Sequence, residues 1–239
     1  MNKKLFLAIA CPIWAIAIVA TSFWILWNNK AQTPVVEPET AAQNEAQAES
    51  VFPVIAQEQI FAISETHFDW VSDPKDTEKT LNAVESVVRA KVLSADPASF
   101  LRPTAGSPYT PLNVQVLEVM SGDLELGSQT LYFPGGSVTA EQYLEANPTS
   151  GQKIGLEDMT QNERQKYYLD FPSEMDCDLN KNTEYVFLLV EDERVPNGYF
   201  IFTGGYSIFT TDKKNVKTGN ELKSTKASKA KVAASTPAE

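Results

Sequence analysis

The sequence contains only two cysteines, Cys11 and Cys177, and a single histidine, His67, in 239 residues. Two cysteines, one of them inside a long apolar stretch, provide no framework of intrachain disulfides. A structural zinc site also lacks ligands, because it normally needs four Cys or His side chains. The folded part of the chain therefore has to be held together by its hydrophobic core.

Motifs of the common catalytic and nucleotide-binding sites are missing as well. The chain has no serine nucleophile elbow, no phosphate-binding loop and no dinucleotide fingerprint, and we read Gly135-Gly136 and Gly204-Gly205 as turn glycines. We therefore expect no cofactor. His67 and Cys177 could in principle form a thiolate–imidazole pair. Neither lies in a local catalytic signature, so a surface histidine and a small apolar cysteine are the simpler interpretation.

Basic residues are scarce relative to acidic ones. The chain has 20 Lys and Arg against 31 Asp and Glu, a net charge of −11. Between Phe61 and Asp212 there are 24 acidic and 10 basic residues, so this part carries −14. Phosphate binding needs Lys and Arg, and we therefore exclude nucleic acid as a partner. The acidic charge favours solubility and repels anionic lipid headgroups.

One long apolar run, from Leu5 to Trp27, stands out against these absences, and Cys11 is its only ionisable residue. As a helix it would span about 34 Å, enough for a hydrocarbon core of about 30 Å. Lys3 and Lys4 precede it and only Lys30 follows it, which places residues 1–4 in the cytoplasm by the positive-inside preference. The sequence thus predicts a single-pass plasma-membrane protein with the bulk of the chain outside the cytoplasm.

Two alternatives for this run remain open. Small residues within it fit a cleaved signal peptide, although the run exceeds the usual apolar core of about 7–15 residues. Ala8-Ile9-Ala10-Cys11 resembles a loose lipobox, in which Cys11 would carry the lipid. All three interpretations place the remaining chain outside the cytoplasm.

The rest of the chain divides by composition. Residues 28–60 are rich in Ala, Gln, Glu and Pro, and we expect a disordered spacer. Residues 61–212 carry the strand patterns and form the predicted extracytoplasmic β-domain. Residues 213–239 are rich in Lys, Ala, Ser and Thr without an aromatic residue, and we expect a disordered tail.

Strand patterns dominate the predicted domain, because apolar residues alternate with polar ones or form short continuous runs. The expected strands are 87–93, 112–120, 129–133, 185–190 and 199–210, the last with a bend or bulge at Gly204-Gly205. The apolar residues of 61–70 either form an edge strand or pack as a lead-in to the domain. Short helices are expected in Asp76–Glu85 and after Thr139, and a Thr160-x-x-Glu163 capping box predicts a helix through Leu169. The pattern indicates a mainly β fold, a small closed barrel of five strands with inserted short helices.

A family resemblance supports this fold. The segment Glu85-Ser-Val-Val-Arg-Ala-Lys-Val-Leu-Ser94 resembles the first strand of netrin-type OB barrels, the fold of the tissue inhibitors of metalloproteinases. Later pieces agree: Val114-Gln-Val-Leu-Glu-Val with Ser121-Gly122-Asp123, Asn182-Thr-Glu-Tyr-Val-Phe-Leu-Leu, and Gly204-Gly205. The resemblance covers residues 87–211 and implies an OB-like barrel. It does not imply protease inhibition, because these inhibitors use an N-terminal disulfide-bonded Cys and this chain has no Cys near Glu85.

One segment has the spacing of a metal loop. Oxygen-bearing side chains alternate at Asp176, Asp178, Asn180, Asn182 and Glu184, as in the first part of a calcium loop. Lys181 stands where such loops need Gly, and Phe187 stands where they need a bidentate Glu. A polar turn leading into the next strand is the competing interpretation.

These observations favour a non-enzymatic, membrane-tethered extracytoplasmic binding module, in which the spacer holds the β-domain off the membrane to bind a protein or envelope ligand. One alternative is a structural subunit of a membrane complex, in which the Leu5–Trp27 helix itself makes the contacts. The other is an enzyme that uses His67 or Cys177 with nearby carboxylates.

Overall fold

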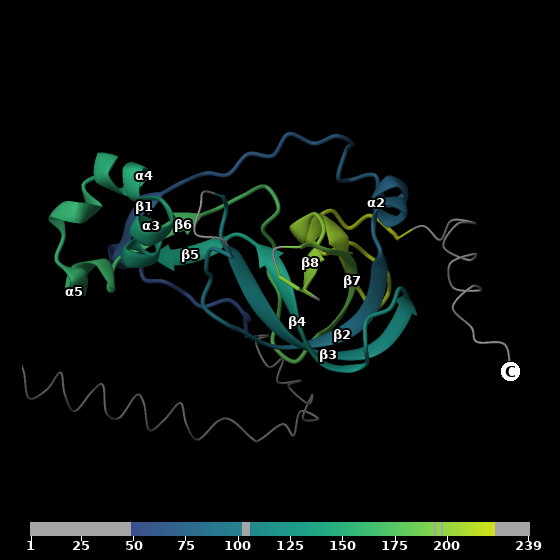
Figure 1. The fold of residues 1–239 in the computed structure, drawn as a ribbon. Coiled ribbons are helices and arrows are strands. Elements are labelled where there is room, and N and C mark those ends of the chain that lie inside the picture. Colours follow the sequence, from purple (N-terminus) through teal and green to yellow (C-terminus); the bar gives the residue numbers. More distant parts are fainter. Residues whose placement is uncertain (1–48, 102–105, 194, 197, 223–239) are drawn as a thin grey trace, which may run out of the picture. The chain divides into compact units, whose positions relative to one another are not determined.

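The computed structural model describes residues 49–101, 106–193, 195, 196 and 198–222, which form a mainly β structure with a few short helices (Figure 1). The predicted membrane helix Leu5–Trp27 lies outside these residues, as does the part of the predicted spacer before residue 49. Within the described part of the chain, no helix has the length and apolar character needed to cross a bilayer.

The elements follow one another along the chain in a β-rich order. The strands are β1 Ile60–Ile63, β2 Ser86–Ala95, β3 Tyr109–Ser121, β4 Gly127–Pro134, β5 Gly136–Thr139, β6 Tyr168–Phe171, β7 Glu184–Glu191, β8 Tyr199–Ile201 and β9 Ile208–Thr210. The α-helices are α2 Thr77–Ala83, α3 Ala140–Ala146, α4 Pro148–Lys153 and α5 Gln161–Arg164, and the 3-10 turns are η1 Gln57–Gln59, η2 Leu156–Asp158 and η3 Gly204–Ser207.

Five strands close into a barrel, which confirms this part of the predicted fold. Their order is β2-β3-β4-β8-β7, and β7 pairs with β2 to complete the ring. All pairs are antiparallel except β4–β8, which is parallel. The barrel closes around an apolar interior because alternate residues of each strand point inward, as Leu112, Val114 and Val116 of β3 do.

Strands β8 and β9 are two parts of one interrupted strand. Both pair with the same edge of β7, Leu189 lying opposite Ile201 and Phe187 opposite Ile208, while residues 202–207 loop out between them. The sequence predicted a bend at Gly204-Gly205, and the structure places η3 there. Glycine is required at position 204, because φ is +52° and a Cβ atom would lie 2.7 Å from the Cβ of Met175.

A second, smaller sheet lies at one end of the barrel. Its order is β1-β6-β5, with β1 parallel and β5 antiparallel to β6 (Figure 1). Helices α3, α4 and α5 lie beside it, and the segment from β5 to β6 is inserted between barrel strands β4 and β7. The sheet has its own core, which consists of Ala98, Val138, Ala140, Leu156, Leu169 and Phe171.

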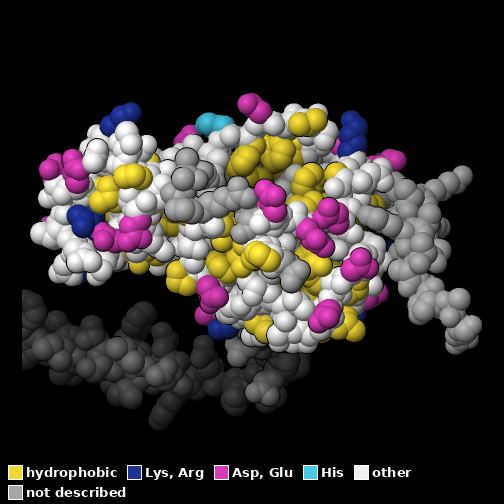
Figure 2. All heavy atoms as spheres, in the orientation of Figure 1, with side chains coloured by type: hydrophobic (Ala, Val, Ile, Leu, Met, Phe, Trp, Pro, Cys, Tyr) yellow, Lys and Arg dark blue, Asp and Glu magenta, His cyan; other side chains and the backbone are white. Residues whose placement is uncertain are grey.

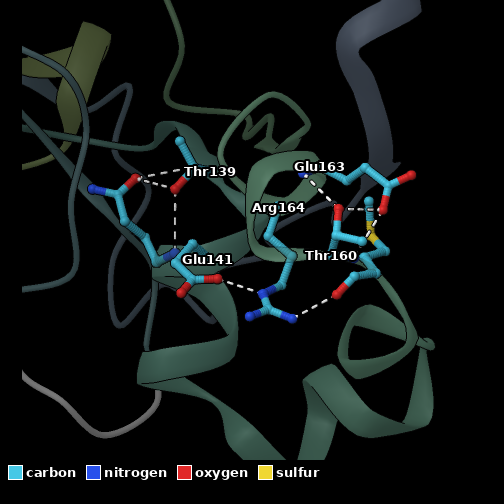
Figure 3. Close-up of polar contacts among 7 residues, drawn as sticks. Thr139, Glu141, Thr160, Glu163 and Arg164 are labelled. Carbon is cyan, nitrogen blue, oxygen red and sulfur yellow. Dashed lines mark hydrogen bonds and ion pairs between the residues drawn. The ribbon is translucent and has the colours of Figure 1, made fainter.

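The prediction for the second part of this insertion was partly wrong. The Thr160 capping box is confirmed, since Thr160 Oγ1 accepts from the amide of Glu163 and the Glu163 carboxylate accepts from the amide of Thr160 (Figure 3). The helix ends at Arg164, however, and not near Leu169. Tyr168–Phe171 forms β6 instead, because Leu169 and Phe171 gain a buried place between two partner strands.

A half-buried ion pair joins the two capped helices. Arg164 Nε donates to the carboxylate of Glu141 in α3, and its Nη1 donates to the carbonyl of Met159 at 2.7 Å (Figure 3). Thr139 caps α3 in the same way as Thr160 caps α5. The insertion is therefore held by polar contacts as well as by its small core.

The fold also extends beyond the predicted limits of 61 and 212. Val51 is buried in the barrel core, and its amide donates to the carbonyl of Leu179. At the other end, residues 213–222 fold back onto the barrel, and Asn215 is only 4% exposed. A polar composition suggested a spacer and a tail, but Val51 and Asn215 are buried, so the residues around Val51 and residues 213–222 belong to the folded domain.

Candidate functional site

A shallow groove of about 400 Å³ lies on the outer face of β3 and β4, and we call it the barrel groove. It is lined by Leu93, Asn113, Val114, Ser128, Gln129, Thr130, Tyr132, Val195 and Gly198. The first seven residues come from the barrel strands, and the last two come from the loop between β7 and β8. The groove is therefore formed by barrel strands with a loop at its border.

Strand alternation places the polar side chains of the groove. Leu112 and Leu131 point into the core, so their neighbours Asn113 and Thr130 face outward. Asn113 Nδ2 donates to Ser94 Oγ at 3.2 Å, and Thr130 Oγ1 lies 3.5 Å from Asn113 Oδ1. These contacts orient a row of amide and hydroxyl groups that leave hydrogen-bonding capacity toward solvent.

The barrel groove is neutral on a strongly acidic domain. Among the described residues that line it there is no Asp, Glu, Lys or Arg, whereas residues 61–212 carry −14. On the face drawn in Figure 2, acidic side chains are scattered over the surface with hydrophobic patches between them. A groove lined by neutral polar groups suits a neutral ligand that both donates and accepts hydrogen bonds.

Aromatic rings support one end of the groove. Tyr132 stacks on Phe200 with ring centroids 4.9 Å apart, and Phe200 meets Tyr109 edge-on at 5.2 Å. Phe200 is buried, so the half-buried Tyr132 rests on a fixed base. Sequence analysis did not single out Tyr132 or Asn113, although their alternation with buried residues was the signal that marks them as outward-facing.

An apolar groove of about 290 Å³ lies next to this aromatic cluster. Phe68 and Trp70, which precede α2, form one side of it, and Tyr109, Phe200 and Phe202 contribute from the barrel. Trp70 is held in place, because its Nε1 donates to Glu174 at 2.7 Å and its ring meets Tyr206 edge-on at 6.3 Å. The segment before α2 is therefore fastened to the barrel by aromatic contacts.

The structure gives the two candidate catalytic residues different surroundings. His67 is strongly exposed, and its Nε2 lies 3.7 Å from the carboxylate of Glu65. Cys177 is a free thiol that lines a cavity to which His67 does not contribute. Burial raises the pKa of the Cys177 thiol to about 12, although the positive charge of Lys217 opposes this effect. A thiol with this pKa is a poor nucleophile at neutral pH.

We therefore expect slow alkylation of Cys177 in the folded protein. In a Cys11→Ser variant, iodoacetamide at pH 8 should modify Cys177 at least about tenfold more slowly than in urea, because the buried thiolate is disfavoured. Mass spectrometry of the Cys177 peptide measures both rates. Equal rates in the two states would contradict the burial of this thiol.

Two of the five candidate calcium ligands, Asp176 and Glu184, have hydrogen-bond partners of their own. Asp176 accepts from the amide of Ser173 at 2.8 Å, and Glu184 accepts from Arg89 Nη1 at 2.8 Å. Asn182 occupies a turn with φ +61°, and the amide of Asn180 donates to the hydroxyl of Tyr185. Asp178, Asp176 and Glu184 do not form a group that could hold a metal ion, and no such group of three His, Cys, Asp or Glu occurs among the described residues. Calcium binding at this segment stays a prediction.

In comparisons with known proteins, no protein-family model, curated protein or solved structure matches this chain.

Proposed function

We propose that this chain is a non-enzymatic, membrane-tethered extracytoplasmic module that binds its ligand in the barrel groove. Leu5–Trp27 anchors the chain in the plasma membrane with residues 1–4 in the cytoplasm. The length of the apolar run and the lysines on its two sides support this orientation. The β-domain then faces the envelope outside the cytoplasm.

The proposed fold type is an OB-like barrel of the netrin kind. The strand order β2-β3-β4-β8-β7 with a parallel β4–β8 pair supports this assignment, because OB barrels close in the same way. OB domains bind ligands on the face of their second and third strands, between two loops. The corresponding strands here are β3 and β4, which form the barrel groove. This part of the proposal rests on analogy between folds.

The ligand we propose is a neutral, hydroxyl-rich chain, such as an uncharged glycan of the cell envelope. The neutral lining of the barrel groove carries this choice, because the surrounding domain is strongly acidic and would repel an anionic polymer. Asn113, Gln129 and Thr130 provide donors and acceptors for hydroxyl groups. Tyr132 provides an amphipathic ring for the apolar face of a sugar.

Binding of oligosaccharides tests this function. We expect the full-length protein in detergent to bind a neutral N-acetylglucosamine oligomer saturably in calorimetry, and Tyr132→Ala to weaken binding at least about tenfold, the loss of an aromatic contact in a binding site. Tyr167→Ala is the matched control, because Tyr167 is also partly exposed but lies outside the groove.

The outcome separates this function from its alternatives. Unchanged affinity in Tyr132→Ala would move the site elsewhere on the domain. Absence of binding to neutral and acidic oligosaccharides alike would overturn the glycan proposal.

A further inference from the structure

A cavity of about 200 Å³ lies between the barrel and the small sheet, and we call it the junction cavity. Its lining consists of Phe52, Pro53, Ala98, Thr110, Phe133, Gly136, Ser137, Asp170, Phe171, Pro172, Asp176 and Cys177. None of these residues lines the barrel groove. The junction cavity is therefore separate from the barrel groove, and both sheets contribute to its lining.

Aromatic residues from both cores border the junction cavity. Phe133 belongs to the barrel core, and Phe171 belongs to the core of the small sheet. Phe52, from the segment before β1, packs on Phe133 with ring centroids 5.2 Å apart and is only half-buried. The cavity thus offers apolar and aromatic surface to a small molecule, and Phe52 is the most exposed of its three phenylalanines.

Two carboxylates lie in the same lining. Asp170 Oδ1 accepts from Ser137 Oγ at 2.7 Å, and Asp176 accepts from the hydroxyl and the amide of Ser173. Within the described ranges neither carboxylate forms an ion pair. The ammonium group of Lys217 binds the main-chain oxygen of Asp176 at 2.8 Å, not its carboxylate.

The negative charges of Asp170 and Asp176 also repel each other. Burial raises the pKa of Asp176, and the charge of Asp170 raises it further, against the hydrogen bonds from Ser173 and the charge of Lys217, which lower it. A cation placed in the cavity would stabilise both carboxylates in their ionised form.

We propose that the junction cavity binds a small organic cation whose charge is spread over alkyl groups, such as a quaternary ammonium. The carboxylates attract the charge, and the phenylalanines contact the alkyl groups and supply cation–π attraction. The volume limits the ligand to a small molecule, because pockets for drug-sized ligands measure about 300–1,000 Å³. A divalent metal ion fits less well, because the described lining has two carboxylates and the described residues contain no group of three His, Cys, Asp or Glu that could hold a metal ion.

Calorimetric titration of the full-length protein in detergent with choline tests this proposal. The comparison ligand is 3,3-dimethyl-1-butanol, which has the same shape without the charge. We expect choline to bind at least about tenfold more tightly than this alcohol, since the charge is recognised by two carboxylates. This comparison needs no variant and therefore does not depend on the folding of one.

Variants then locate the site. Asp170→Asn and Asp176→Asn should each weaken choline binding several-fold, whereas Glu145→Gln, which removes the same charge from an exposed position of α3, should leave it unchanged. Phe52→Ala should weaken choline binding as well. It should shift the unfolding transition of the protein less than the truncation of a core residue does.

Glycerophosphocholine distinguishes the source of the cation. Tighter binding than that of choline would assign a lipid headgroup, and weaker binding would assign the free cation.

Two results would overturn the proposal. One is equal affinity for choline and the neutral alcohol, and the other is equal loss of binding in the Asp170→Asn and Glu145→Gln proteins. Loss of glycan binding in Tyr132→Ala leaves this test unaffected, because the two sites share no lining residue.

Discussion

Replacing Gly136 by alanine is expected to destabilise the folded domain by about 3–5 kcal/mol, from backbone strain and overpacking together. Gly136 joins β4 to β5 with φ +116°, a conformation that residues with a Cβ atom rarely adopt. A Cβ atom would also lie 2.4 Å from Thr110 Oγ1 and 2.8 Å from the Cβ of Ala98. Thr110 cannot move away freely, because it is buried and donates to the carbonyl of Gly135 at 2.9 Å.

Gly127 provides a matched control for this substitution. It also has a positive φ, +107°, but a Cβ atom added there would meet nothing within 4 Å. Gly127→Ala should therefore cost only the backbone strain, about 1–3 kcal/mol. Equilibrium urea unfolding of both variants, followed by circular dichroism, gives the two free energies. Equal losses would show that crowding at the β4–β5 junction contributes nothing.

Replacing Asn215 by alanine is expected to cost about 2–4 kcal/mol of unfolding free energy, because several buried polar groups lose their partners at once. Asn215 Nδ2 lies 3.0 Å from each of the carbonyls of Gly205, Tyr206 and Ile208. Its Oδ1 accepts from the amides of Lys217 and Thr218. One side chain thereby joins the C-terminal segment to the interrupted strand formed by β8 and β9.

Asn220→Ala is the control, because Asn220 lies in the same segment but is exposed. It should change the unfolding free energy by no more than about 0.5 kcal/mol. Hydrogen exchange of the amides in β9 provides a local measurement, and Asn215→Ala should accelerate exchange there most. If the Asn215→Ala protein were as stable as the wild type, Asn215 would not anchor the C-terminal segment. Residues 213–222 would then contribute little to the stability of the fold.

The sequence anticipated the barrel where side-chain alternation is a local property. Leu112, Val114 and Val116 repeat with period two, and this pattern alone places one face of β3 inside. Tyr185–Val190 reads as a continuous apolar run because this part of β7 has the barrel interior on one face and a second cluster, which includes Val186, Leu188 and Phe209, on the other. The capping box at Thr160 could also be predicted from the sequence, since Thr160 and its partner Glu163 lie within one helical turn.

The candidate sites were less predictable from sequence because their residues converge from distant parts of the chain. Asn113 and Tyr132 belong to different strands, and Val195 comes from a loop that reaches the same groove only when β8 pairs with β4. Asp170 and Asp176 stood out only as part of an acidic composition or of a calcium-like spacing. Their position beside Phe52 depends on the packing of the small sheet against the barrel.

The sequence alone determined four features: the scarcity of disulfide and zinc ligands, the acidic charge, the apolar run Leu5–Trp27 and the strands with period-two alternation. Each of these features depends only on residue types and on near neighbours in the chain. The tertiary structure alone decided the parallel pairing of β1 with β6, the end of α5 at Arg164 and the burial of Asn215. These features arise from contacts between segments far apart in sequence. The free energy of these long-range contacts outweighs the local conformational preferences of the residues. It therefore cannot be read from patterns among neighbouring residues.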